Sequence, residues 1–286
     1  MRTLRNSCVA IVMVSLSISC FAQFGGLAQK AQEAQQRAKE AKQAKAIYTA
    51  WSPEKEQQVG EASAAKLISI FGLYENPDMV KYVNLVGNVV AQRAERKIPY
   101  RFGILNTEVI TALSLPGGYV FITRGALANM KSEAELAGTL AHEVAHVDQR
   151  HLEKEIRSKD SMAFIKQETA QFSQTDLDKV ASTFVSGALS QKYSRDKESD
   201  ADRLGLQFAS NAGYEADGLR MFLTFLSQAP KTPDSSRQLG LWGSTHPPLA
   251  ERIASLTALE ANYPKEGQVL AERFLRHVNA EAFAPH

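Results

Sequence analysis

Residues 139–146, with the sequence TLAHEVAH, constrain the fold of this 286-residue chain more than any other segment. The tetrapeptide SEAE at 132–135 precedes them, and a serine followed three places later by glutamate is typical of a helix start. We therefore expect one helix to carry both segments, with Leu140 and Val144 on its packed face. Residues four apart share a helix face, so His142 and His146 would point toward the same place.

Two imidazoles on one helix face can bind a single tetrahedral zinc ion. Glu143 projects about 100° round the helix from His142, which places it beside the metal rather than on it. Its carboxylate can therefore take a proton from the water that attacks a peptide bond. The alternative is a chance histidine pair on an amphipathic helix, but the cap and the apolar surroundings of the pair argue against it.

A catalytic zinc needs three protein ligands and one open position. The metzincin pattern would place glycine at Gln149 and a third histidine at Leu152, so the chain does not fit it. His151 is one residue off, on a different helix face, and we interpret it as a surface or second-shell residue. The remaining option is a downstream acid.

Glu198 and Asp202 supply that option, because they lie four apart on a helix that we expect at 195–211. Glu198 is suited to be the third ligand. Asp202 is suited to accept a hydrogen bond from a ligating histidine and so fix its tautomer. Taken alone, the pair would be an ordinary solvated acidic face; beside the histidine helix it completes a zinc site.

Several segments then occur in an order known from one family: LPGGYVF at 115–121, the histidine motif, YSR at 193–195, ESDADRLG at 198–205, and STHPP at 244–248 followed by Arg252. Over about Trp51 to Leu256 the chain resembles the HtpX and CAAX prenyl protease family of gluzincin zinc metallopeptidases. The best-known members span membranes several times. This chain offers no such spans, so it is more similar to the soluble periplasmic or lipoprotein branch.

The resemblance implies roles for individual residues. It implies that His142, His146 and Glu198 bind one Zn²⁺ per chain and that Glu143 is the general base and acid. It also implies that His246 and Arg252 sit near the metal and contact the substrate or the tetrahedral intermediate, and that His246 can itself occupy the fourth zinc position. The alternative for His246 is a turn residue before a helix.

The strand expected at 119–123 has a further expected role. As an edge strand facing the cleft, it would add a peptide substrate as an extra strand. The residues expected to bind substrate in this way are Gly118, Tyr119, Val120 and Phe121. The alternative, an ordinary sheet strand, is compatible with this role.

The predicted fold is α+β and mostly helical: a zincin-like metallopeptidase with a small β-sheet beside the histidine helix. We expect helices at 53–71, 77–95, 161–191, 195–211, 217–226, 248–261 and 269–278, and strands at 100–105 and 119–123. The expected organisation is a signal peptide (1–22), an Ala/Gln/Lys-rich helical spacer (23–50), the metallopeptidase domain (51–264), and a C-terminal helix and tail (265–286).

The N-terminal sequence predicts a secretory signal, because Arg2 and Arg5 precede a short apolar run. We expect cleavage after Ala22. An uncleaved N-terminal anchor is an alternative that the short apolar run does not favour. The rival is lipidation of Cys20, which would tether the protein to a membrane. Cys8 and Cys20 are the only cysteines, so the mature domain would have neither a disulfide nor a thiolate ligand. The expected location is the periplasm, or the outer membrane for a lipoprotein.

The formal net charge is +2, so the sequence lacks the excess of basic residues that is typical of nucleic-acid binding. The expected function is zinc-dependent hydrolysis of peptide bonds in unfolded or misassembled cell-envelope proteins, with polypeptides, including outer-membrane proteins, as partners. The alternative is a zinc-containing periplasmic assembly or chaperone-like factor with little proteolytic activity.

Overall fold

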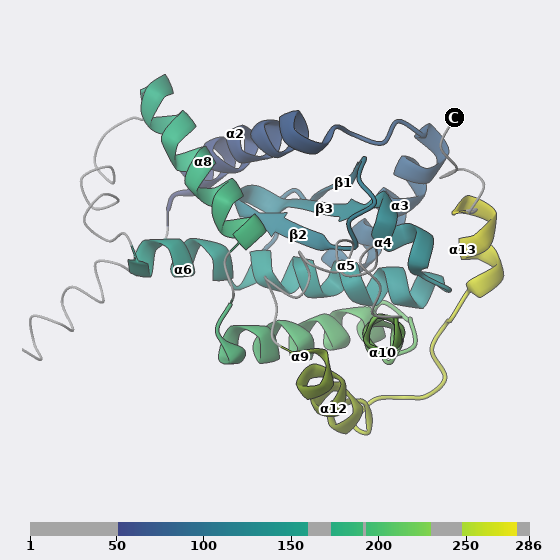
Figure 1. The fold of residues 1–286 in the computed structure, drawn as a ribbon. Helices are drawn as coiled ribbons and strands as arrows, with labels where there is room; N and C mark the ends of the chain where they lie inside the picture. Colours follow the sequence, from purple (N-terminus) through teal and green to yellow (C-terminus); the bar gives the residue numbers. More distant parts are fainter. Residues whose placement is uncertain (1–50, 160–172, 191–192, 230–247, 279–286) are drawn as a thin grey trace, which may run out of the picture. The chain divides into compact units, whose positions relative to one another are not determined.

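The computed structural model describes residues 51–159, 173–190, 193–229 and 248–278 (Figure 1). The predicted signal peptide (1–22), the spacer (23–50) and His246 lie outside these ranges. So do residues 161–172 and 191 of the helix predicted at 161–191, whose described part includes α8 (Gln174–Ser190). Among the described helices, none is both long and apolar enough to cross a membrane.

Two capped helices open the described chain. Helix α2 (Pro53–Phe71) begins after Ser52, whose side chain accepts a hydrogen bond from a backbone N–H one turn on. Helix α3 (Pro77–Ala91) begins in the same way after Asn76. It ends four residues before the predicted limit, in a tighter turn where the N–H groups of Arg93 and Ala94 donate to carbonyls three residues back.

A three-stranded sheet follows, made of β1 (Arg101–Leu105), β2 (Ala112–Leu115) and β3 (Tyr119–Thr123). The strand order is β1-β3-β2; β1 runs parallel to β3 and β2 antiparallel to it. A single 3₁₀ turn, η1 (Pro116–Gly118), joins β2 to β3. Gly118 has φ +86°, and a Cβ there would lie 2.2 Å from the carbonyl oxygen of Pro99, so this turn requires glycine.

This topology corrects one prediction. Strand β3 is central rather than an edge, since Val120 pairs with Phe102 on one side and with Ser114 on the other. Of the residues expected to bind substrate, Tyr119, Val120 and Phe121 therefore offer no free edge, and Gly118 belongs to the turn before the strand. The prediction was wrong because β2 has only four residues, ALSL, and lacks the alternation that marks a half-buried strand.

Helix α5 (Glu133–Asp148) carries the histidine motif and lies beneath the sheet, with α9 (Arg195–Asn211) on its other side (Figure 1). Helix α10 (Gly218–Gln228) also packs on α5, whereas α2 and α8 cover the opposite face of the sheet. Every residue of α5 is buried, as expected for a helix enclosed on all sides. Side chains of β3 alternate between two cores: Val120 and Ile122 face α5, and Phe121 faces α2 and α8.

The remaining elements are α4 (Arg124–Asn129), α6 (His151–Lys159), α12 (Leu249–Glu260) and α13 (Ala271–His277). Strand β2 and helices α4 and α6 were not predicted. Apart from α8, the other elements with predicted limits lie within a few residues of them, and α2, α9 and β3 match theirs. A mostly helical chain with a small sheet beside the histidine helix confirms the predicted α+β, zincin-like class.

The C-terminal helix α13 is tied to the first residue of α5. Buried Glu133 accepts hydrogen bonds from Tyr82 (2.6 Å) and Tyr214 (2.7 Å), and Arg273 of α13 donates to it from Nε at 2.6 Å. Burial raises the pKa of Glu133, but the bonds from Arg273 and the two tyrosines outweigh it, and the pKa is lowered overall. The ionised form is therefore the one that these donors hold.

We expect Glu133→Ala to lower the free energy of unfolding by about 3 kcal/mol, because it leaves Arg273 and two buried hydroxyls without their acceptor. Urea denaturation at neutral pH measures this. The control is Glu108→Ala, which removes a glutamate whose side chain is 65% exposed in its ion pair with Arg124. Its cost should stay below about 1 kcal/mol. Equal costs for the two variants would contradict the structural role of Glu133.

Candidate metal centre

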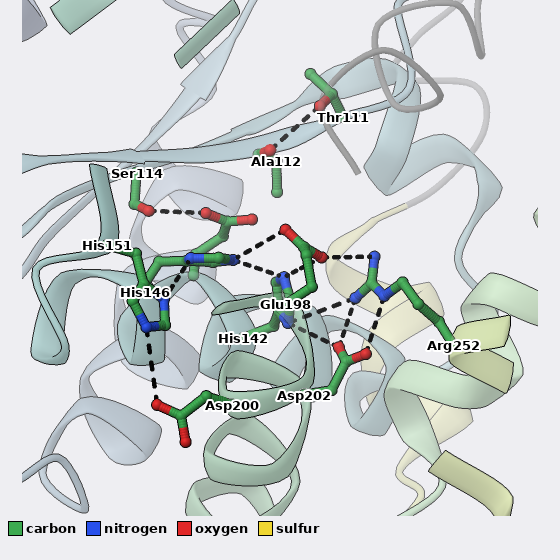
Figure 2. Close-up of polar contacts among 11 residues, drawn as sticks. Thr111, Ala112, Ser114, His142, His146, His151, Glu198, Asp200, Asp202 and Arg252 are labelled. Carbon is green, nitrogen blue, oxygen red and sulfur yellow. Dashed lines mark hydrogen bonds and ion pairs between the residues drawn. The ribbon is translucent and has the colours of Figure 1, made fainter. Parts of the chain in front are cut away.

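Three side chains, from α5 and from the first turn of α9, converge where these two helices pack together. His142 Nε2 and His146 Nε2 are 3.1 Å apart, and the carboxylate of Glu198 lies 3.8 Å from the first and 3.5 Å from the second (Figure 2). The close approach of the two helices depends on Gly205 of α9, where a Cβ would lie 2.8 Å from the backbone of His142. The structure thus brings together the three predicted ligands.

The geometry of these residues fits one zinc ion. Ligand atoms bound to tetrahedral zinc at about 2.0 to 2.2 Å lie roughly 3.3 Å from one another, close to the spacing of His142, His146 and Glu198. Nitrogen and carboxylate oxygen donors in a two-to-one ratio are a common ligand set for catalytic zinc. Within the described residues, no other group of histidine, cysteine and acidic side chains lies close enough to hold a metal.

Asp202 and Arg252 lie behind His142. The Oδ1 atom of Asp202 is 2.9 Å from His142 Nδ1, and Arg252 donates to both oxygens of Asp202, at 3.0 and 2.6 Å. Burial raises the pKa of Asp202, but the Arg252 guanidinium and His142 lower it more, to about 2. An ionised Asp202 accepts the Nδ1–H of His142, which leaves the Nε2 lone pair directed at the metal position.

Glu143 lies beside the candidate ligands, between α5 and β2. Its Oε2 atom accepts a hydrogen bond from Ser114 Oγ at 2.8 Å. Its Oε1 atom is buried and has no hydrogen-bond partner among the described residues. A buried carboxylate oxygen without a donor is costly, and such an atom is expected where a water or substrate group completes the site.

The formal charges of the centre point to a dication. Three buried carboxyl side chains gather here, those of Glu143, Glu198 and Asp202, and one buried guanidinium, that of Arg252. Three negative charges and one positive charge give these described residues a formal net charge of −2. A divalent cation between His142, His146 and Glu198 would balance that charge.

The structure revises, narrows or adds to the sequence interpretation at three residues of the centre. Arg252, expected to contact substrate, has a side chain only 3% exposed and is turned toward Asp202 and Glu198, so the geometry favours a positioning role. His151 is buried and its ring contacts His146, so of its two predicted placements the surface one is excluded. Ser114 was missed; its sequence signal is a lone hydroxyl in an apolar run beside the PGG turn.

Known proteins show similarity over this same region. The profile of peptidase family M48 matches residues 78–260, a range that includes all of the residues discussed above. The putative beta-barrel assembly-enhancing protease of Vibrio cholerae is 28% identical over 221 residues, which are 74% of this chain and 45% of that protein. The beta-barrel assembly-enhancing protease of Escherichia coli K12 is 24% identical over 212 residues, 70% of this chain and 42% of that protein.

A third relative comes from a plant. The mitochondrial metalloendopeptidase OMA1 of Arabidopsis thaliana is 30% identical over 167 residues, 58% of this chain and 32% of that protein. The chain spans less than half the length of each of these three relatives. The predicted resemblance to gluzincin metallopeptidases is confirmed at the level of the family.

Proposed function

The chain belongs to peptidase family M48, and from this premise we propose that it is a zinc-dependent endopeptidase acting on unfolded or misassembled cell-envelope proteins. The observation that carries the proposal is the convergence of His142, His146 and Glu198 beside Glu143, a carboxylate with one oxygen that has no hydrogen-bond partner within the described part of the chain. Three ligands beside such a carboxylate are what hydrolysis needs, whereas a structural zinc site is normally closed by four protein ligands.

Each side chain of the centre has a separate role in the proposed reaction. A bound zinc would supply a Lewis acid that polarises the scissile carbonyl and acidifies the attacking water. Glu143 takes the proton of that water on Oε1, while Ser114 holds Oε2 and so orients the carboxylate. Glu143 then delivers the proton to the leaving amine. Asp202 and Arg252 keep the ligands oriented from behind.

Strand β2 is the edge at which a peptide substrate would bind. The opposite edge, that of β1, is occupied: the side-chain amide of Asn84 bonds both the N–H and the C=O of Phe102, and the N–H of Tyr74 donates to Ile104. No described strand pairs with the outer side of β2. Ser114 of β2 touches Glu143, so a peptide added there would run past the catalytic carboxylate.

The envelope as the place of action is supported by the relatives and by the N-terminal sequence. Two of the three relatives carry beta-barrel assembly in their names. The positively charged start and short apolar run of residues 1–22 are those of a secreted protein. We therefore propose a periplasmic enzyme of the soluble branch, free or tethered through a lipidated Cys20, with outer-membrane proteins as its substrate class.

Removal of the metal tests the proposal. We expect the purified protein to contain about one zinc per chain, and dialysis against a chelator to reduce casein cleavage to background. One equivalent of zinc should restore cleavage, whereas magnesium should not, because a site with two imidazoles selects zinc over an ion that prefers oxygen ligands. Cleavage unaffected by the chelator would refute the proposal. Bound zinc without turnover on any unfolded substrate would favour the assembly-factor alternative.

A further inference from the structure

We propose that His151 is a positioning residue that holds the imidazole of His146 in the tautomer and orientation required for zinc binding. The inference rests on the proposed zinc site and adds a residue to it. It concerns a side chain outside the ligand triad, on a different helix.

The turn between α5 and α6 brings His151 onto His146. If α5 continued, a residue five places on would point about 140° away from His146. Instead α5 ends at Asp148, and Arg150 adopts a left-handed backbone conformation, with φ +53°. Helix α6 then starts at His151, whose ring lies edge-on to that of His146 with centroids 5.0 Å apart.

The left-handed conformation of Arg150 is held in place by its side chain. A non-glycine residue in this region costs roughly 1 to 2 kcal/mol. The guanidinium of Arg150 lies 3.1 Å from Glu56 and 3.2 Å from Glu153, and it also donates to the backbone carbonyl of Trp51 at 3.4 Å. Both glutamates are buried, so these contacts fix the turn and with it the position of His151.

The hydrogen bond between the two histidines assigns their protons. His146 Nε2 faces His142 and Glu198, so it must be unprotonated to bind a metal, and Nδ1 must carry the proton. His146 Nδ1 is 2.9 Å from His151 Nδ1, which therefore accepts. The proton of His151 then lies on Nε2, which is 3.7 Å from Asp200 Oδ2.

One further contact supports this arrangement. On the other side, the ring of Tyr193 stacks on His146, with centroids 4.3 Å apart and planes 20° apart. His146 is thus held by His151 at its Nδ1 edge and by Tyr193 on its face. Asp202 fixes the tautomer of His142 in the same way, through its Nδ1 atom.

A matched pair of amide variants tests the role of His151. Asparagine places a carbonyl oxygen near the position of the histidine Nδ1 atom, whereas glutamine places it near Nε2. We therefore expect His151→Asn to bind zinc within about threefold of the unmodified protein, and His151→Gln to bind it about 10- to 100-fold more weakly. Competition with a chromophoric chelator measures the affinity, and the absorption bands of bound Co²⁺ report the ligand geometry.

The control is Leu152→Ala, which removes a buried side chain next to His151. It should lower the thermal midpoint without changing zinc affinity, which separates a merely structural effect from positioning of the ligand. Equal zinc affinities for the Asn and Gln variants would overturn the inference while leaving the proposed function intact. If the unmodified protein binds no zinc, both the inference and the proposed function are wrong.

Discussion

Replacing Glu143 by glutamine should leave zinc bound and slow peptide hydrolysis by about 10²- to 10⁴-fold. Glutamine has the shape of glutamate and its carbonyl oxygen can still accept from Ser114 Oγ, so the site keeps its packing. What it loses is an atom that can take a proton at the Oε1 position, which no described residue contacts through a hydrogen bond. The measurement is kcat/KM on an unfolded protein substrate, together with the zinc content of the same preparation.

The companion variant is Ser114→Ala, which keeps the carboxylate and removes only its hydrogen-bond donor. A single hydrogen bond contributes about 1 kcal/mol, so we expect a loss of about tenfold or less. Adding this change to Glu143→Gln should cost little more, because the serine acts through the carboxylate. A Glu143→Gln protein that cleaves at the normal rate in a clean preparation would refute the proposed mechanism.

The parts of the site that lie on single helices could be predicted from the sequence. Ser132 caps α5 as expected, with its hydroxyl accepting from the N–H of Glu135. The spacing of four residues then places His142 and His146 on one face, and the same spacing on α9 places Glu198 and Asp202 together. These features depend on local rules of helix capping and periodicity, which operate within a few residues of sequence.

The parts that depend on contacts distant in sequence could not be predicted. The strand ALSL is too short for a periodic signal, and without it β3 looks like an edge. His151 reaches His146 only because Arg150 takes a left-handed conformation, which is held by Glu56, nearly one hundred residues earlier in the chain. Helix α5 is buried on every side, so its sequence carries no stripe that shows which face meets which neighbour.

Replacing Arg252 by methionine should lower the free energy of unfolding of the zinc-free protein by about 3 to 5 kcal/mol. Methionine preserves much of the side-chain volume, but it leaves the buried carboxylates of Asp202 and Glu198 without the guanidinium between them. The control is Arg220→Met, since the partly exposed Arg220 makes comparable bonds to Glu260. Its expected cost is about 1 kcal/mol. Equal costs would show that the buried carboxylates do not depend on Arg252.

Lowering the pH and adding zinc should both reduce the loss in free energy of unfolding caused by Arg252→Met. In the unmodified protein the pKa of Asp202 is about 2, below the value of about 3.9 for an unfolded chain. A lowered pKa stabilises the fold above pH 3.9, and this stabilisation is lost as the pH falls toward 2. Without the guanidinium the pKa of Asp202 should be higher, because only His142 then opposes the effect of burial, so the difference between the two proteins should be largest at neutral pH and shrink below about pH 4. Zinc should also reduce the difference in stability between the two proteins, because its two positive charges offset the same carboxylates. A difference that depends on neither pH nor zinc would contradict the electrostatic role of Arg252.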